Sequence, residues 1–340
     1  MNFKFTTFVL ILFILTIIFF TAYTFFDSIN TNNSSLYPNS QPNQATLQLT
    51  NPNSNYKVYF CPEDDCNSVL YNLFEKAKTI DCAVYDIKMD WIYSILNTKD
   101  KKVRLIEDDY QLSKTKISAN ISDLSEKQEL RTDKSKKYMH NKFCIFDSNI
   151  LLIGSTNFTE DAIKNQNNNF IVTDNNLFVK ELQSYFNNLW QGNFTKGFSY
   201  KNACFSPNNC INYYINEAEN AKKSIKCMFF SFTNKDFEKE LEQKKQQGLD
   251  VKIIMEKSQN SHYSQYKNLE NDGINVIWDK NPHYMHNKFC IFDNNTIITG
   301  SMNMSNNGNY NNNESIILIN NKDLASKYES YFDKYFTEWS

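Results

Sequence analysis

The sequence predicts an α/β protein made of two similar α/β/α layered domains in tandem, preceded by a transmembrane helix and a disordered linker. Three observations support this prediction. The decapeptide YMHNKFCIFD occurs at residues 138–147 and again at 284–293, and such self-similarity indicates a duplicated unit. Strand-like and helix-like segments alternate within each copy. The chain also opens with a long run of residues that carry no charge.

The uncharged N-terminal segment, Phe5–Phe26, contains 22 residues. A helix of this length spans a bilayer core of ~30 Å. A cleaved signal peptide is the competing interpretation, but its apolar region is normally only ~7–15 residues long. Lys4 precedes the segment and no further Lys or Arg follows until Lys57, so the positive-inside rule places the N-terminus in the cytoplasm. We therefore expect a single-pass membrane protein with its anchor at residues 1–26 and its catalytic domains outside the cytoplasm, or a secreted protein if the segment is cleaved.

A polar segment rich in Asn, Ser and Pro covers residues 27–55. It cannot bury enough apolar surface to fold, so we expect a flexible linker. The remaining chain is long enough for two domains of ~150 residues or somewhat fewer, and His140 and His286 are 146 residues apart. We predict the first domain at residues 56–195 and the second at 200–340.

Within each copy the same elements are expected in the same order. An initial strand precedes a helix with one apolar face, and two further strands lead to the repeated decapeptide. Polar turns then separate the decapeptide from another apolar strand, and an aromatic helix closes each copy near Trp190 or Trp339. In the second copy, Gly248 is a stop signal for a helix expected at residues 236–247. In the first copy these segments are the strand 58–62, the helix 70–77, the strands 80–85 and 103–106, and the turn 147–149. In the second copy they are, in the same order, 203–207, 211–218, 225–230, 251–254 and 293–295.

Eight cysteines are compatible with export, where disulfides persist. Cys144 and Cys290 lie inside apolar runs, and we expect them to be buried free thiols. Cysteines 61 and 66, and likewise 204 and 210, flank short polar turns, where local bridges are one of two open alternatives. No CxxC pair occurs, so a structural zinc site is not expected. The net charge of −2 gives no global basic surface for nucleic acid.

The chemistry is carried by a longer pattern that occurs twice, HxKx4Dx6GSxN. The alternation of an extended segment places His and Lys on one face, where both can point at the same anion. Lys supplies positive charge, and His can act as nucleophile or proton carrier near neutral pH. Asn and Ser one strand later can donate to the same oxygens. The residues are His140, Lys142, Asp147, Ser155 and Asn157 in the first copy, and His286, Lys288, Asp293, Ser301 and Asn303 in the second.

Duplication supplies what a single copy lacks. Cleavage of a phosphodiester through a covalent intermediate needs one nucleophile and a separate acid for the leaving oxygen. Two histidines on facing repeats provide both groups. The lysines and asparagines would stabilise the charge on the phosphoryl group without a metal.

The duplicated pattern resembles the HKD motif of the phospholipase D superfamily, and the resemblance covers the chain from about Lys57 to Trp339. The second copy is most similar to the small bacterial endonucleases of that superfamily. The resemblance implies a phosphohistidine mechanism without cofactor or metal, in which one His attacks and the other protonates the leaving group. It also implies that Asp147 and Asp293 are mainly structural, and that a chain holding both motifs is catalytically complete as a monomer.

One position departs from the family pattern. Family members commonly place a carboxylate after the GSxN element to hold the imidazole, and Glu314 fills this role in the second copy. The equivalent residue of the first copy is Asn168. An amide can accept a hydrogen bond from an imidazole but cannot stabilise its cation. The usual assignment of the first-motif His as nucleophile is therefore left open.

The motif predicts a phosphodiester substrate but does not identify which class of phosphodiester it is. A membrane anchor favours phospholipids, through phospholipase D-type hydrolysis or transphosphatidylation. The likeness of the second copy to nucleases, with Tyr138 and Tyr284 available for stacking on bases, favours a membrane-anchored endonuclease as the alternative. The third hypothesis is a noncatalytic anchored binding module, although both motifs retain their His, Lys, Ser and Asn residues.

Overall fold

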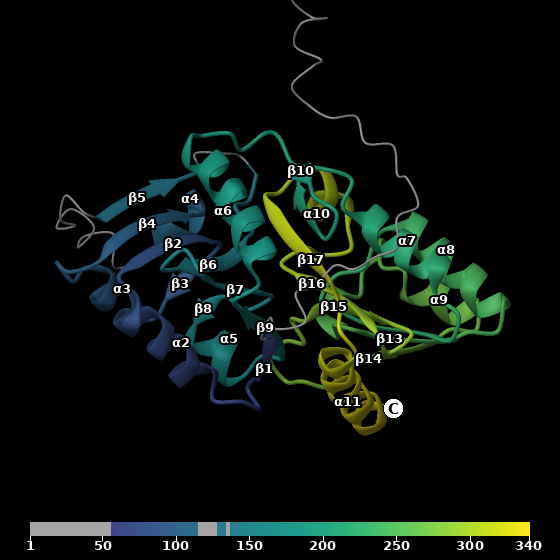
Figure 1. Ribbon diagram of the computed structural model, residues 1–340. Coiled ribbons are helices and arrows are strands. Elements are labelled where there is room, and N and C mark those ends of the chain that lie inside the picture. The colour runs from purple at the N-terminus through teal and green to yellow at the C-terminus, as the bar shows by residue number, and fades with distance from the viewer. Residues whose placement is uncertain (1–55, 115–127, 134–136) are drawn as a thin grey trace, which may run out of the picture. The chain divides into compact units, whose positions relative to one another are not determined.

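A computed structural model describes residues 56–114, 128–133 and 137–340 of the chain. Within these residues, one sheet of seven strands belongs to the first copy (Figure 1). Strands β2, β4 and β5 are parallel to one another, whereas the other neighbours are antiparallel. In spatial order the strands are β1 (Tyr56–Cys61), β9 (Asn168–Thr173), β7 (Ile150–Gly154), β6 (Lys142–Phe146), β2 (Thr79–Val84), β4 (Lys102–Glu107) and β5 (Gln128–Thr132).

The second copy builds an equivalent sheet in the same described part of the chain, with one extra edge strand, β10. Its order is β10 (Phe198–Ser199), β11 (Ala203–Ser206), β17 (Glu314–Asn320), β16 (Thr296–Gly300), β15 (Lys288–Phe292), β12 (Ser224–Phe229), β13 (Asp250–Met255) and β14 (Asn275–Trp278). A small pair, β3 (Ile87–Lys88) and β8 (Phe158–Thr159), is separate. The mixed α/β fold with two copies in tandem is therefore confirmed, while the exact domain limits stay a prediction.

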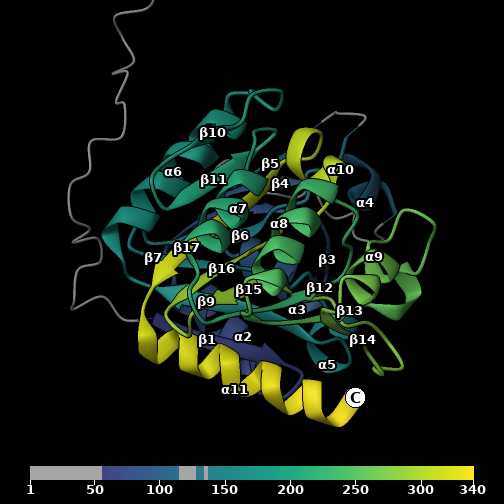
Figure 2. The ribbon, with the colours of Figure 1, turned by 90° about the vertical axis from the view of Figure 1, so that its right-hand side faces the viewer.

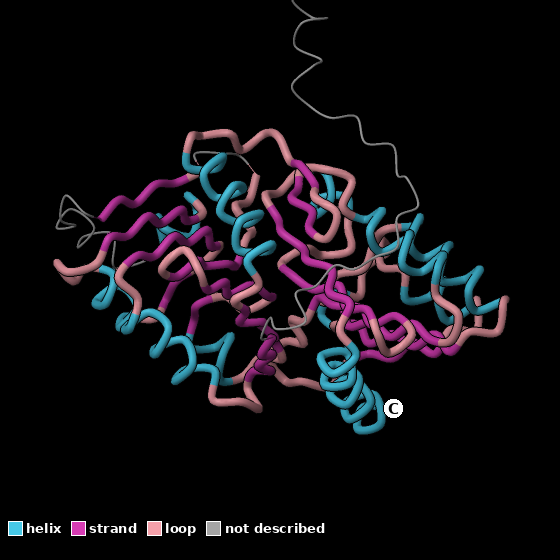
Figure 3. Tube along the Cα trace, in the orientation of Figure 1, coloured by secondary structure: helices cyan, strands magenta, loops and turns pink. Residues whose placement is uncertain are grey.

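Helices cover both faces of each sheet (Figures 1 and 3). This explains why β6 and β15, both KFCIF, are buried at every position, since a sheet covered on both faces favours continuous apolar strands. The helices of the first copy are α2 (Cys66–Lys76), α3 (Asp90–Leu96), α4 (Asp109–Lys114), α5 (Glu160–Lys164) and α6 (Asn176–Trp190). Those of the second are α7 (Ile211–Asn220), α8 (Lys235–Gln246), the 3-10 helix η3 (Lys257–Gln259), α9 (Tyr266–Asn271), α10 (Asn306–Tyr310) and α11 (Lys322–Trp339).

The closing helices join the two copies. Helix α6 packs on β2, β6 and β7 of its own sheet and also contacts β11, whereas α11 packs on the second sheet and contacts β1. One central apolar cluster accordingly contains residues of both sheets and both helices, for example Phe143, Tyr185, Phe289 and Tyr328. The two copies share a core, which fixes their facing edges relative to each other.

The structure corrects the expectation for two cysteines. Cys144 and Cys290 are buried as predicted, but each forms a disulfide, with Cys82 and Cys227 respectively. The sequence separations of 62 and 63 residues conceal these pairs. The antiparallel registers β2–β6 and β12–β15 place the partners directly opposite each other, with Cα–Cα distances of 4.2 Å. The local bridges, 61 to 66 and 204 to 210, are also present.

The expectation of a single-pass membrane protein is also corrected. In the described part of the chain no helix is both long and apolar enough to cross a bilayer. The segments predicted as an anchor, residues 1–26, and as a linker, residues 27–55, lie outside the described residues. Hydropathy of the isolated segment was the basis of that prediction, and the structure gives no spanning helix to support it.

Candidate active site

The two His-x-Lys pairs lie where β6 and β15 begin. Each lysine ammonium donates to the carbonyl oxygen of its own histidine, Lys142 to His140 at 2.8 Å and Lys288 to His286 at 2.7 Å. All four side chains are buried. Each motif is therefore a compact unit in which the imidazole and the ammonium lie side by side.

The backbones of the two motifs are tied to each other's copy. The amide of His140 donates to the carbonyl of Asn313 at 2.9 Å, and that of His286 donates to Asn167 at 2.8 Å. Short parallel bridges join Met139 to Asn313 and Asn167 to Met285. Each histidine is thus positioned by the segment that opens the last strand of the opposite copy.

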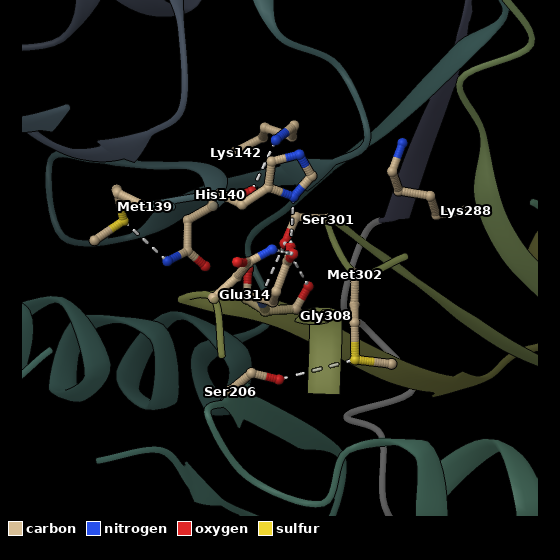
Figure 4. Close-up of polar contacts among 12 residues, drawn as sticks. Met139, His140, Lys142, Ser206, Lys288, Ser301, Met302, Gly308 and Glu314 are labelled. Carbon is tan, nitrogen blue, oxygen red and sulfur yellow. Dashed lines mark hydrogen bonds and ion pairs between the residues drawn. The ribbon is translucent and has the colours of Figure 1, made fainter. Parts of the chain in front are cut away.

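The imidazole partners are exchanged in the same way (Figure 4). Nδ1 of His140 lies 2.8 Å from a carboxylate oxygen of Glu314. Nδ1 of His286 lies 2.9 Å from the side-chain oxygen of Asn168. The carboxylate anticipated for the second motif therefore serves the first-motif histidine, and the asparagine of the first copy serves the second.

Neighbouring donors determine the proton positions. Ser301 and Asn312 donate to the two oxygens of Glu314, at 2.6 and 3.1 Å. When this carboxyl group is ionised it accepts in every contact, and Nδ1 of His140 is then the donor. The oxygen of Asn168 likewise accepts from Ser155 at 2.9 Å, while its amide nitrogen donates to Ala162 at 3.0 Å. Both histidines are thereby held with Nε2 available for chemistry.

Burial and mutual repulsion govern the ionisation of the side chains in this site. Burial lowers the pKa of both histidines well below the usual value, and the charges of Lys142 and Lys288 lower it further. Burial also lowers the pKa of Lys142 to about 7 and that of Lys288 well below its usual value. Burial raises the pKa of Glu314 to about 8, although the Lys142 charge opposes this rise. With a neutral ring, the His140–Glu314 contact is a hydrogen bond, and it becomes an ion pair when the ring gains positive charge.

The GSxN element brings a second strand against the histidines. A Cβ on Gly154 would lie 2.2 Å from the carbonyl oxygen of Asn169, and one on Gly300 would lie 2.0 Å from that of Ser315. Only glycine permits this approach. The serines of the element donate to Asn168 and Glu314, so they position the imidazole partners and are not free to donate to a substrate.

The asparagines of the GSxN element have unsatisfied side-chain atoms. The amide oxygens of Asn157 and Asn303 are buried and have no hydrogen-bond partner in the described part of the structure. Buried polar atoms normally have partners. Their position, three residues after Gly154 and Gly300, suits contact with a bound polar group.

The motif aspartates lie at the other end of the strands. Asp147 accepts from the backbone amides of Lys78 and Thr79, each at 2.8 Å. Asp293 accepts from the amides of residues 222–224. Both aspartates close the turns that follow β6 and β15, so they support the strands and do not reach the histidines.

Sequence reasoning missed two aromatic residues of the site. The ring of Tyr85 lies 5.0 Å from that of His140, and Phe230 lies 4.8 Å from His286. Lys142 and Lys288 lie over the same two rings, at 4.9 and 5.1 Å. Each follows the strand that pairs with the motif strand, and their repetition at equivalent positions was the available signal.

Two carboxylates were missed as well. Asp108 accepts from the amide of Met139 at 3.1 Å, and Glu256 accepts from the amide of Met285 at 2.7 Å. Each lies directly after the strand next to β2 or β12. They fix the residue before each histidine.

The assembled groups are suited to an anion. Two lysines and two imidazoles from opposite copies lie close enough to influence one another's charge, and Figure 4 shows Lys142 and Lys288 on either side of His140. No group of three His, Cys, Asp or Glu residues that could hold a metal ion occurs among the described residues. A tetrahedral phosphoryl group could contact both lysines and both Nε2 atoms.

Comparison with known proteins gives a family match. The family model described as "Cardiolipin synthase, PLD-like domain" matches residues 70–190 and again residues 214–336. The mitochondrial cardiolipin hydrolase of Xenopus laevis is 36% identical over 99 residues, which cover 28% of this chain and 46% of that protein. The match thus spans about half the length of this relative.

Solved structures are also similar. The phospholipase D family member Nuc from Salmonella typhimurium is 29% identical, with a TM-score of 0.38, over 40% of this chain and 92% of that one. Phosphatidylserine synthase from Haemophilus influenzae Rd KW20 is 10% identical, with a TM-score of 0.61, over 83% of this chain and 89% of that one. The second comparison shows a common fold across both copies.

Proposed function

The chain belongs to the phospholipase D superfamily of phosphodiesterases, and we propose that it hydrolyses the phosphodiester bond to the head group of a phospholipid, through a phosphohistidine intermediate. The observation that carries the proposal is the crossed pairing of the two imidazoles. His140 contacts a carboxylate and His286 contacts an amide. This difference gives two chemically similar residues two separate tasks.

His140 is the nucleophile in this proposal. When its Nε2 bonds to phosphorus, the ring gains positive charge, and the carboxylate of Glu314 stabilises that charge through Nδ1–H. Asn168 cannot do the same for His286, because an amide is neutral. His286 is therefore the better proton carrier, since it must give up a proton readily to the leaving oxygen.

The reaction proceeds in two displacements. In the first, Nε2 of His140 bonds to phosphorus, the bond to the leaving alcohol breaks, and Nε2–H of protonated His286 supplies the proton to the departing oxygen. In the second, neutral His286 takes a proton from water as the water oxygen bonds to phosphorus and the bond to His140 breaks. Lys142, Lys288, Asn157 and Asn303 stabilise the charged phosphoryl oxygens in both steps.

The substrate itself helps to establish the required protonation states. Burial and the charges of both lysines lower the pKa of His286. The negative charge of a phosphodiester favours the protonated forms of His286 and the lysines. Substrate binding thus supplies the proton donor that the first displacement needs.

A phospholipid is the preferred substrate for two reasons. The family model and the hydrolase from Xenopus both carry cardiolipin in their descriptions. The chain also has a net charge of −2, which provides no broad attraction for a polyanion. Single-stranded nucleic acid is the second candidate, because Tyr138 and Tyr284 flank the two motifs with 48% and 43% of their surface exposed.

The test is a parallel assay of the purified protein in excess EDTA. Substrates are phosphatidylcholine vesicles, phosphatidylglycerol vesicles, and single-stranded and duplex DNA, with His140→Ala and His286→Ala as controls. Head-group release that is lost in both variants supports the proposal. DNA cleavage with intact lipid would replace it with the nuclease alternative, and lipid activity that survives either substitution would refute the paired-histidine mechanism.

A further inference from the structure

A large polar recess lies beside the second motif. It has a volume of about 930 Å³ and is lined by the start of α8, by residues 260–268 and by Asn306 at the start of α10. Figure 2 shows where the helices α8, α9 and α10 lie in the second copy. The lining side chains are mostly amides, hydroxyls and charged groups. Such side chains can form hydrogen bonds with a hydrated ligand.

Residues that line the recess follow residues of the proposed active site closely along the chain. Thr233 is three residues beyond Phe230, whose ring contacts His286. Asn306 is three residues beyond Asn303, and the amide of Thr233 donates to the carbonyl of Met304 at 2.8 Å. Three residues of extended chain cover roughly 10 Å, so the recess begins within one small molecule's length of His286.

The charge of the recess is positive. Lys235 and Lys267 are exposed in its lining, and neither forms an ion pair with another described residue. Asp236 supplies one negative charge to the lining, and Glu238, which interacts electrostatically with Lys235, lies outside it. Two ammonium groups against one carboxylate favour an anionic ligand, and the surrounding amides and hydroxyls favour one rich in oxygen atoms.

The geometry of displacement connects this recess to the reaction. In phosphoryl transfer the attacking and leaving atoms lie roughly in line on opposite sides of phosphorus. With His140 as nucleophile, the leaving alcohol extends past His286 into the second copy, where the recess lies. We infer that the recess binds the leaving alcohol, and that it selects an alcohol with several oxygen atoms and a negative charge. This inference rests on the function proposed above and specifies its head-group class.

Direct binding tests the inference without requiring turnover. The probes are sn-glycerol 3-phosphate, as a free anionic alcohol, and choline, as a cationic one, titrated calorimetrically into the full chain. Three proteins are compared: the unmodified chain, the double variant Lys235→Gln/Lys267→Gln, and Lys239→Gln. Lys239 is exposed on α8 one turn from Lys235 and does not line the recess, so it controls for loss of charge from the same helix.

We expect the unmodified chain to bind sn-glycerol 3-phosphate more tightly than choline. The affinity of the double variant for sn-glycerol 3-phosphate should be at least ~10-fold lower. Lys239→Gln should bind this probe as tightly as the unmodified chain does. Equal binding by the double variant would place the probe elsewhere and overturn the inference, as would a preference for choline. A second measurement, hydrolysis of bis(p-nitrophenyl) phosphate, should be unchanged in the double variant because the catalytic groups are intact. If the probe binds as expected but no phospholipid is cleaved, the phospholipid proposal fails while the anionic subsite stands.

Discussion

The two copies present the same His-x-Lys pair in different surroundings. The position that follows the GSxN element is Asn168 in the first copy and Glu314 in the second, and each contacts the histidine of the other copy. Beneath the first motif lies a buried carboxyl group, Glu107, where the second copy has Met255. The two halves of the candidate site are therefore similar but not equivalent, and we propose that these differences separate their roles.

The largest effect is expected from removing either histidine, and the two losses should differ. His140→Ala should lower turnover by at least ~10³-fold on every substrate, because no phosphoenzyme can form. His286→Ala should still release one p-nitrophenolate per site from bis(p-nitrophenyl) phosphate, since this leaving group needs no proton, and then stall. Rapid-mixing absorbance gives the burst, and mass spectrometry locates the phosphorylated residue. A burst in His140→Ala with phosphate on His286 would reverse the assignment.

The next effect concerns the crossed partners. Glu314→Gln keeps the hydrogen-bonding shape but removes the charge, and we expect it to lower kcat by about 10 to 100-fold. Asn168→Asp makes the two copies alike, and its negative charge should raise the pKa of His286. The activity of Asn168→Asp should therefore persist to higher pH than that of the unmodified protein. Its kcat should change less than the kcat of Glu314→Gln. Equal kcat values for Glu314→Gln and the unmodified protein would contradict the division of roles.

A third difference between the copies lies in the shared core. The side-chain oxygen of Asn169 accepts from Thr299 and Tyr328, each at 2.9 Å, and its nitrogen donates to Asn287 at 2.8 Å. Its counterpart, Ser315, has a buried hydroxyl without a partner among the described residues. Asn169→Ser should lower the free energy of unfolding by about 2 to 4 kcal/mol, because it leaves several buried groups unpaired.

The control for that change is Ser315→Ala, which removes an unpaired hydroxyl and should leave stability unchanged or slightly higher. Denaturant unfolding of both variants measures the contrast. Equal destabilisation by the two substitutions would show that the network around Asn169 contributes no more than its counterpart in the other copy.

The smallest effect is a pH dependence of stability. Burial raises the pKa of Glu107 to about 8, although hydrogen bonds from Tyr93 and the amide of Ile87 oppose the rise. The folded state therefore holds this proton more firmly than the unfolded state, so its stabilising effect is complete at low pH and is lost as the pH rises to about 8.

Glu107→Gln should remove that loss. Relative to the unmodified protein, the variant should gain about 1 to 2 kcal/mol between pH 6.5 and pH 8, as measured by denaturant unfolding at each pH. Met255→Leu, at the equivalent position of the second copy, should show the pH dependence of the unmodified protein. Parallel curves for Glu107→Gln and the unmodified protein would mean that Glu107 does not titrate in this range.

Much of the fold was accessible from the sequence. The duplicated decapeptide located both motif strands, and the closing helices end at Trp190 and Trp339 as expected. Gly248, with φ of 90°, follows α8 at the predicted stop. These features depend on residues close together in the chain, where hydrophobic periodicity and backbone preference act directly.

The pairs that complete the site could not be predicted. His140 and Glu314 are separated by 174 residues, and His286 and Asn168 by 118. The sequence named all four residues but placed the carboxylate with the second motif, whereas it contacts the histidine of the first. The cross-strand disulfides and the ring contacts of Tyr85 and Phe230 were hidden for the same reason, because each depends on the register between strands that are distant in sequence.

The sequence by itself determined the repeated α/β architecture, the phosphodiesterase family and the repeated residues of the candidate site, because a repeated local pattern can be recognised without knowledge of packing. Only the tertiary structure decided which copy's groups serve which histidine. The two copies face each other across a shared core formed by α6 and α11. That packing brings each GSxN element to the opposite motif, and this exchange makes two equivalent motifs into one site with two different histidines.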